Sequence, residues 1–438
     1  MHLYSVCDNN VIIHIMKKLS YVFAAAAIVM ATASCEKISD IIHGVSETEE
    51  GLVDDKGKDL TPDEQKVKIE ETANTLMELM DKSQWEAEYN KVNSTVESMG
   101  EKNLNGDNVS GYLENIVSLW ESVEGEDPNK VYVIVAHLTD LKGHFTENAE
   151  GGFDIDPNFD DLAITVFDNG VPVTATFAAK DEGPAPFHYV DENDDVTYYI
   201  PGKVLLTISK NNELLGSLEL RLNPKDVNAD GYITEDDAIS IGYTIKVGVY
   251  TFELSQADYA TDHASVKASI KNGKKLVIGA EVSASYAYTM EEKEEGNVNF
   301  EVTQASAKAM VDLAGKTQIR FSLPDAVELE TLTEELYKQE ENEEAYKETL
   351  AKIEKLYGFG VYYDGKKTLQ ATLGFEPMYD ETYKCWNASP VIRFADGTSY
   401  AVEEYFTEER FGDLAQSIMT WVNDLYSYLG LDKQENAK

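Results

Sequence analysis

Apolar and polar residues alternate with a period of two through the middle of the chain, from about residue 126 to residue 324. The alternation begins in "KVYVIVAHL", and short stretches rich in Asn, Asp and Gly interrupt it. A period of two puts every second side chain on the same face, so the pattern predicts strands with one buried and one solvated face. We expect residues 126–324 to form an antiparallel β meander.

Three of the interruptions predict hairpin turns. Asn, Asp and Gly accept the positive φ angles that tight hairpin turns require. The predicted turns lie at Asp168, Asn169 and Gly170, at Asn211 and Asn212, and at Asn272 and Gly273.

Two segments of this region share a sequence pattern. "TFELSQA" occupies 251–257, "NFEVTQA" occupies 299–305, and a Gly-Lys pair follows each of them, at Gly273 and Gly315. The likeness suggests a repeated hairpin unit within the meander.

Residues 61–125 are expected to be a helical lead-in. Thr61 is placed to cap a helix, Pro62 suits its first position, and Glu64 completes a capping box. Apolar residues then recur at helical spacing, at Ile69, Ala73, Leu76, Met77 and Met80. Further helix is expected through Trp85 and in "GYLENIVSLWESV", residues 111–123.

Residues 325–438 are expected to be an α+β region. A helical insertion spans 325–357, with an apolar side formed by Leu329, Leu332, Leu336, Leu350, Ile353 and Leu356. Strands follow, with turns at Asp364 and Gly365 and at Asp396 and Gly397, and an amphipathic helix covers 407–429. The predicted fold class is therefore α+β, predominantly an antiparallel β meander in a large twisted sheet, sandwich or half-barrel. N-terminal helices precede it, and the C-terminal helix packs on the sheet.

The charge balance limits the partners. Lys and Arg number 37 against 80 Asp and Glu, so the formal net charge is −43. Such a surface repels nucleic acid phosphates and anionic lipid head groups, and it keeps a protein soluble. We expect no nucleic acid partner, and nothing in the sequence implies an oligomer.

The N-terminus carries a targeting pattern. From Met16, the expected true start, the chain reads "MKKLSYVFAAAAIVMATASCEK", with two lysines, an apolar stretch and small residues ending at Cys35. This resembles the signal peptide of bacterial lipoproteins, in which the cysteine receives a lipid and becomes the mature N-terminus. The resemblance implies that residues 1–34 are a signal peptide and that Cys35 is lipidated.

Several expectations follow from that resemblance. Residues 35–60 are polar and acidic, as a flexible tether between a lipid and a folded body would be. A lipidated Cys35 leaves Cys385 without a partner, so we expect no disulfide and a buried thiol at Cys385. The lipid joins the protein to the membrane, and the localisation would be the cell envelope of diderm bacteria, as an outer-membrane lipoprotein.

One loop has the spacing of a metal site. In "DVNADGYITEDDA" the side chains of Asp226, Asn228, Asp230, Thr234 and Asp237 and the carbonyl of Tyr232 stand at ligand positions around Gly231. This resembles an EF-hand calcium loop, and Asp at position twelve resembles dockerin modules. It implies one structural Ca²⁺ at residues 226–237, with a strand before the loop and a short helix, "EDDAISIGY", after it. The alternative is an Asx-rich turn.

No catalytic constellation is evident. His137 and His144, the nearest pair of histidines in the predicted mature chain, lack metal-ligand spacing, and no nucleophile elbow or phosphate loop is found. We expect a non-catalytic, ligand-binding lipoprotein whose ligand is a glycan or a peptide. The alternatives are a carrier of lipid or lipoprotein with a curved sheet, and a structural or adhesive surface subunit.

Overall fold

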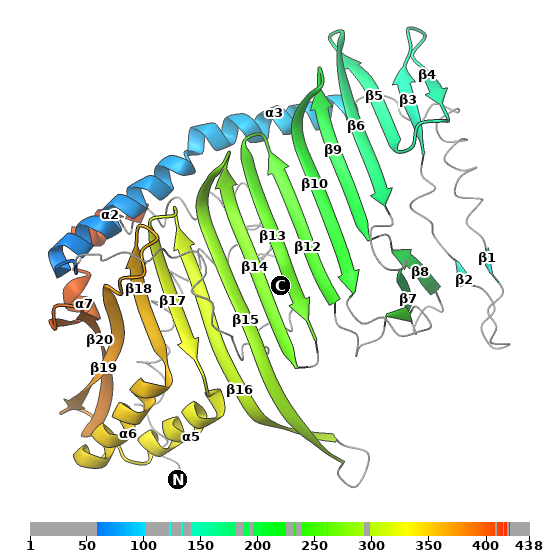
Figure 1. The fold of residues 1–438 in the computed structure, drawn as a ribbon. Coiled ribbons are helices and arrows are strands. Elements are labelled where there is room, and N and C mark those ends of the chain that lie inside the picture. Colours follow the sequence, from blue (N-terminus) through cyan, green and yellow to red (C-terminus); the bar gives the residue numbers. More distant parts are fainter. Residues whose placement is uncertain are drawn as a thin grey trace. The chain divides into compact units, whose positions relative to one another are not determined.

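The computed structural model describes fourteen stretches of the chain (Figure 1). They are 59–100, 122–123, 133–134, 142–180, 187–191, 196–200, 202–224, 232–233, 239–260, 262–292, 298–407, 410–414, 416–417 and 420. Contacts divide the chain into two compact units. The central unit is Ser83–Thr261 with Ile270–Gly273, and the terminal unit is Met1–Lys82, Asp262–Ser269 and Lys274–Lys438. Each unit is described by itself.

The described residues confirm the predicted fold class, because antiparallel strands dominate and helices are few. The helices are α2 (Pro62–Leu79), α3 (Lys82–Gly100), α5 (Ala326–Tyr337), α6 (Glu343–Leu356) and α7 (Val402–Tyr405). The strands up to the loop at 226 are β1 (Ser122–Val123), β2 (Val133–Ile134), β3 (Gly143–Glu147), β4 (Phe153–Asp156), β5 (Leu162–Asp168), β6 (Val171–Lys180), β7 (Phe187–Asp191), β8 (Val196–Ile200), β9 (Lys203–Lys210) and β10 (Glu213–Pro224). The later strands are β11 (Tyr232–Ile233), β12 (Ile239–Val247), β13 (Tyr250–Tyr259), β14 (His263–Asn272), β15 (Lys275–Glu292), β16 (Val298–Leu313), β17 (Thr317–Leu323), β18 (Gly358–Tyr363), β19 (Ala371–Asp380), β20 (Cys385–Phe394) and β21 (Ser399–Ala401).

The main sheet of the central unit has the order β4-β3-β5-β6-β9-β10-β12-β13, followed by the end of β14. Its pairs are antiparallel except β3 with β5, which run parallel because β4 folds back along the outer edge of β3. The predicted turns of β5–β6 and β9–β10 are confirmed. Asn169, Gly170, Asn211 and Asn212 all have positive φ there.

Directly paired residues point to the same side of a sheet, so the register assigns each side chain of the central sheet to a face. One face is apolar. It carries Val173, Ala175 and Phe177 on β6, Val204, Leu206 and Ile208 on β9, Leu218, Leu220 and Leu222 on β10, Ile241, Tyr243, Ile245 and Val247 on β12, and Tyr250, Phe252 and Leu254 on β13. The other face is largely polar, with Lys203, Thr207, Ser209, Ser217, Glu219, Arg221, Thr244, Lys246, Thr251 and Glu253. This two-faced pattern is the one that the period of two predicts.

Helix α3 crosses the apolar face of the central sheet beside the hairpin turns (Figure 1). The ring of Trp85 packs edge-on against Tyr250 and Phe252 of β13, with centroids 5.2 and 5.4 Å away. Further along the helix, Val92 reaches Gly216 of β10, where an added Cβ would meet its methyl groups at 3.6 Å. Helix α3 therefore lies against β10 at Gly216.

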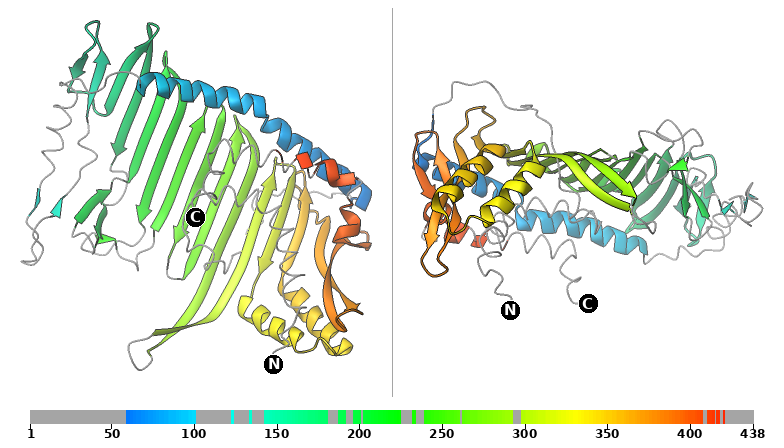
Figure 2. Two further views of the ribbon diagram at one scale, coloured as in Figure 1. Left: turned by 180° about the vertical axis from the view of Figure 1, so that it is seen from behind. Right: turned by 90° about the horizontal axis from the view of Figure 1, so that it is seen from below.

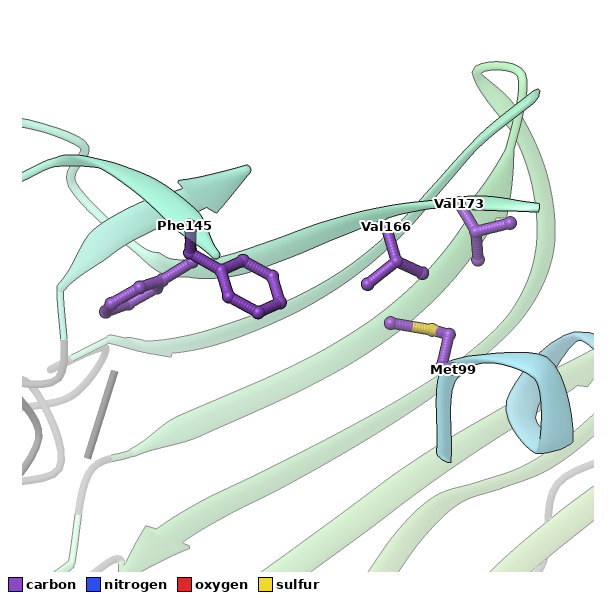
Figure 3. Packing of buried hydrophobic residues seen from close by; sticks show 5 residues of the cluster. Met99, Phe145, Val166 and Val173 are labelled. Atoms are coloured by element: carbon purple, nitrogen blue, oxygen red, sulfur yellow. The ribbon is translucent and has the colours of Figure 1, made fainter. Parts of the chain in front are cut away.

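The far end of α3 closes a core of its own. Figure 3 shows Met99 pointing at Val166 of β5 and Val173 of β6, and all three are buried. Trp85, Val92 and Met99 are spaced by seven residues, or about 10.5 Å of helix, which is close to two strand spacings of about 4.8 Å. Each step of seven residues therefore carries the helix across two strands.

In the terminal unit, β14 to β21 follow one another in sequence order. Two groups of helices pack on this sheet. The predicted apolar side of 325–357 is confirmed, since Leu332, Leu336, Leu350 and Ile353 of α5 and α6 are buried together with Tyr346 against Phe375, Trp386 and Ala388. A short turn at 338–342 separates the two helices, and Asn342 caps the second.

Helix α2 begins with the predicted capping box, in which Thr61 accepts from Glu64 N and Glu64 accepts from Thr61 N. Gln65, almost fully buried, donates from Nε2 to Gln370 O at 2.8 Å and to Leu60 O at 3.2 Å. These bonds satisfy the backbone of an irregular stretch before β19, which explains a buried amide on a helix that was expected to present apolar residues.

The β15–β16 hairpin extends beyond the adjacent strand β17 (Figure 2). The pairing of β15 with β16 continues to Glu292 and Val298, whereas β17 pairs with β16 only as far as Ala307. Val302 pairs with Tyr288 and Gln304 with Ala287, so Thr303 is an extra residue and forms a β-bulge. The bulge lies in the extended part of the hairpin.

The sequence echo corresponds to this bulge. In β13, Leu254 pairs with Tyr243 and Ala257 with Ile241, which leaves Ser255 and Gln256 opposite the single residue Gly242. Ser255 and Thr303 hold the same place in the two heptapeptides. The Gly-Lys turns differ, because Gly273 follows β14 whereas Gly315 follows β16 directly. The repeated element is a bulged strand, and the expected repeat of a whole hairpin is wrong.

Three local expectations are corrected. The short helix expected after the acidic loop is absent from its described part, because Ile239–Val247 form strand β12 and pair with β10. Alternating apolar residues on a sheet face outweigh the helical preference there. Ser122–Val123 are strand β1, not helix. Asn272 ends β14 and only Gly273 of that predicted pair has positive φ.

Candidate apolar binding face

Part of the apolar face of the central sheet is exposed. Five aliphatic side chains on it are 37–43% exposed, namely Leu206, Leu218, Leu220, Ile241 and Ile245. We call these five residues the aliphatic face. Single exposed apolar residues are ordinary on protein surfaces, but a contiguous group on neighbouring strands marks an interaction surface.

The register brings three of these residues into one row. Leu218 of β10 pairs directly with Leu206 of β9 on one side and with Ile245 of β12 on the other. The row continues to Phe177 of β6 and Phe252 of β13. Five adjacent strands therefore place five apolar side chains side by side, across about 19 Å at a strand spacing of about 4.8 Å.

Helix α3 borders the aliphatic face with an apolar flank. Glu88 lies over Gly248, and Lys91 Nζ is 2.9 Å from Glu213 Oε1, so the polar flank of the helix faces the hairpin turns. Tyr89 and Val96 lie on the opposite flank by the 3.6-residue period, and they are 38% and 45% exposed. The exposed apolar surface thus continues from the strands onto the helix.

The reverse face of the same strands has the opposite chemistry. Lys203 Nζ lies 3.7 Å from Glu219 Oε2, and Arg221 pairs with the same carboxylate. Lys271 Nζ lies 2.6 Å from Glu253 Oε2. These charges are paired at a solvated surface, where such pairs contribute little stability, so the reverse face needs no further partner.

The predicted calcium loop falls mostly outside the described residues. Of its expected ligands only Tyr232 is described, in β11, where it pairs with His188 of β7. Asp226, Asn228, Asp230, Thr234 and Asp237 lie outside the described part of the chain. The two ends of the loop are fixed close together, because Pro224 of β10 pairs with Ile239 of β12. A strand follows where the dockerin resemblance implies a helix.

The other predicted positions are partly described. Cys35 and His137 lie outside the described residues. His144 Nε2 is 2.8 Å from Thr165 Oγ1, so this histidine is satisfied within the sheet. Cys385 is buried at the start of β20, which confirms the expected buried thiol.

The described residues contain neither a cluster of metal ligands nor a membrane-spanning helix. In that part of the chain, no three His, Cys, Asp or Glu side chains gather as a metal would require. None of the described helices has the length and apolar character needed to cross a bilayer.

Comparisons with known proteins gave no match: no family model fits the chain, and neither the curated proteins nor the solved structures contain a similar one.

Sequence reasoning identified the strands of the aliphatic face but not the face itself. The alternation in "VLLTISK" and "ELLGSLELRLNP" shows that one side is apolar, yet it does not show how much of that side a helix covers. A comparison of the lengths of the helix and the strands does predict that part of the apolar side is left uncovered by α3. Helix α3 is 19 residues, about 28 Å long and about 10 Å wide, whereas β10 alone is 12 residues, about 40 Å long. One helix cannot cover strands of that length.

Proposed function

We propose that this protein is a non-catalytic, lipid-anchored protein of the cell envelope that binds the acyl chain of a lipid or lipoprotein on its aliphatic face. The single observation that carries the proposal is the row formed by Leu206, Leu218 and Ile245, whose side chains are 37–43% exposed. These side chains offer no hydrogen-bonding group, so only an apolar ligand gains free energy by covering them.

The expected affinity is modest. A chain on an open face is covered on one side, so each methylene contributes about half of the roughly 0.8 kcal/mol of full burial. About a dozen methylenes then give about 5 kcal/mol, a dissociation constant on the order of 10⁻⁴ M. Binding of this strength allows rapid exchange, which suits transfer of a lipid better than its storage.

The glycan or peptide alternative rests on the 25 tyrosines, whose rings offer stacking surfaces. Four of them, Tyr250, Tyr346, Tyr363 and Tyr405, are buried in the two units. Buried rings serve packing, and the exposed side chains on the strands of the apolar face are aliphatic. The acyl-chain proposal therefore has more support from the described surface.

The test uses a chain with Cys35→Ser, which prevents lipidation, and N-phenylnaphthylamine, a neutral dye that fluoresces in apolar surroundings. We expect the dye to bind, bound lipid to appear in native mass spectra, and Leu218→Ser to weaken dye binding about threefold to tenfold. A matched control is Leu214→Ser on the same strand, because Leu214 is 48% exposed but pairs with Ser209 on the reverse face. Equal binding by both variants would contradict the proposal.

A further inference from the structure

We infer that the aliphatic face holds a single linear acyl chain lying across the strands, along the row from Phe177 to Phe252. This inference rests on the proposed function and adds the ligand's shape and orientation. It names Leu206, Leu218 and Ile245 as the residues at the middle of the chain, and Phe177 and Phe252 as the ends that limit its length.

The first argument is the register. The residues of the row are paired directly, strand by strand, from β6 to β13. Side chains in direct register stand about 5 Å apart, so they form a continuous apolar line across the sheet. Along a strand, residues of the same face are about 7 Å apart, which leaves wider gaps in that direction.

The second argument is the border of the row. Helix α3 crosses the same strands (Figure 1), and by the 3.6-residue period its exposed apolar residues Tyr89 and Val96 lie on the flank away from the hairpin turns. Trp85 contacts Phe252 at one end of the row, so a chain along the row touches the strands below it and, at that end, the helix beside it. A chain along a strand would bury less apolar surface, because the gaps are wider in that direction.

The third argument concerns the shape and head group of the ligand. The exposed residues of the face are Leu and Ile, branched side chains that suit a narrow, flexible chain. A fused ring system would instead gain most from flat aromatic partners. The net charge of −43 disfavours an anionic head group, so the occupant is the acyl chain of a neutral or zwitterionic lipid.

The experiment measures binding of alkylphosphocholines, below the concentrations at which they form micelles, to the Cys35→Ser chain. Their extended chains are shorter than, equal to and longer than the row, which spans about 19 Å. We expect affinity to rise about twofold per methylene up to the row length and then to stop rising. Affinity that is independent of chain length, or that keeps rising past the row, would overturn the orientation.

Two matched variants locate the chain. Leu206 of β9 and Ile241 of β12 are 38% and 39% exposed on the two strands that flank β10, but Ile241 lies four residues, about 14 Å, along β12 from the row. We expect Leu206→Ser to weaken binding of the longest chain threefold to tenfold and Ile241→Ser to weaken it less than twofold. Equal losses would mean that the chain runs along the strands and would overturn the inference.

Two further outcomes distinguish the orientation of the acyl chain from the proposed function. Chain-length dependence without a difference between the variants leaves acyl binding intact and rejects only the orientation. No binding of any alkylphosphocholine, together with a concentration-dependent dimer in native mass spectra that Leu218→Ser abolishes, would show that a second copy covers the face. That outcome rejects both proposals. Thermal unfolding of each variant confirms that these exposed substitutions leave the fold unchanged.

Discussion

Glu88 of α3 lies directly over Gly248 in the turn between β12 and β13, where a Cβ atom would be 1.9 Å from Glu88 Oε2. Gly248 also has a φ of +55°, a conformation that costs other residues roughly 1–2 kcal/mol. Two requirements for glycine therefore meet at the point where the helix touches this turn.

Gly248→Ala should lower the free energy of unfolding by about 1–3 kcal/mol, because it adds displacement of Glu88 to the strain at positive φ. The measurement is urea unfolding. Gly170→Ala is the control, since Gly170 has a φ of +80° and no atom within 4 Å of an added Cβ. The excess loss at Gly248 should disappear when Glu88→Ala is introduced as well. An excess that persists without Glu88 would mean that the contact is unimportant.

Trp85→Ala should be far more destabilising, by about 3–5 kcal/mol, because a large ring that is 3% exposed leaves a cavity against Tyr250 and Phe252. Val96→Ala on the same helix, 45% exposed, should change stability by less than about 0.5 kcal/mol. Urea unfolding monitored by circular dichroism distinguishes the two. Similar losses at both positions would contradict the assignment of the helix face that contacts the sheet.

Two buried tyrosines should respond oppositely to loss of the hydroxyl group. Tyr405 OH donates to Pro62 O at 3.0 Å, so Tyr405→Phe should cost about 1 kcal/mol. Tyr357 OH is buried and has no hydrogen-bond partner among the described residues, so Tyr357→Phe should stabilise the protein by about 1 kcal/mol. Thermal and urea unfolding measure both. Destabilisation by Tyr357→Phe would show that this hydroxyl has a partner in solution.

Four tyrosine hydroxyl groups, including those of Tyr357 and Tyr405, limit the stability of the protein at alkaline pH. Burial raises the pKa of Tyr346, Tyr357, Tyr363 and Tyr405 above the ordinary value of about 10. A raised pKa in the folded state means that the stability it gives is complete below pH 10 and is lost as the pH rises further. The urea midpoint should be nearly constant between about pH 8 and about pH 9.5 and fall above about pH 10. A constant midpoint up to about pH 11 would contradict burial of these groups.

Calcium should raise the melting temperature if the loop at 226–237 binds it. A site of the weak extracellular class, with a dissociation constant of about 10⁻⁴ to 10⁻³ M, gives about 1–3 kcal/mol at about 10 mM calcium, or a few degrees. Asp230→Ala should abolish the shift. Asp160→Ala is the control. Asp160 is an exposed acidic residue outside the loop at 226–237, so this variant should keep the calcium-dependent rise in melting temperature. An unchanged melting temperature between calcium and a chelator would favour the Asx-rich turn.

The sequence predicted local structure well wherever one short pattern decides it. The capping box at Thr61 and the turns at Asn169 and Asn211 depend on residues close in sequence, so the residues themselves determined the outcome. Residues 239–243, the first part of β12, were misassigned as helix because their conformation depends on pairing with β10. Burial of Gln65 likewise depends on Gln370, which is far away in the chain.

The aliphatic face shows a second limit of sequence reasoning. Alternation identifies which residues of β9, β10 and β12 share a side, but exposure depends on where α3 crosses them. That position is set by contacts of Trp85 with β13, of Val92 with β10 and of Met99 with β5 and β6. Periodicity within one segment contains no information about which distant segment it will meet.

In the central unit, the rise of seven helical residues is close to the width of two strands. A hairpin adds two strands to the sheet, and seven further residues lengthen α3 by the same distance. Removing a hairpin without removing seven residues of the helix would leave Trp85 or Met99 beyond the edge of the sheet. The number of strands and the length of the helix must therefore change together, and a protein of this architecture can become wider or narrower only in steps of one hairpin and one heptad.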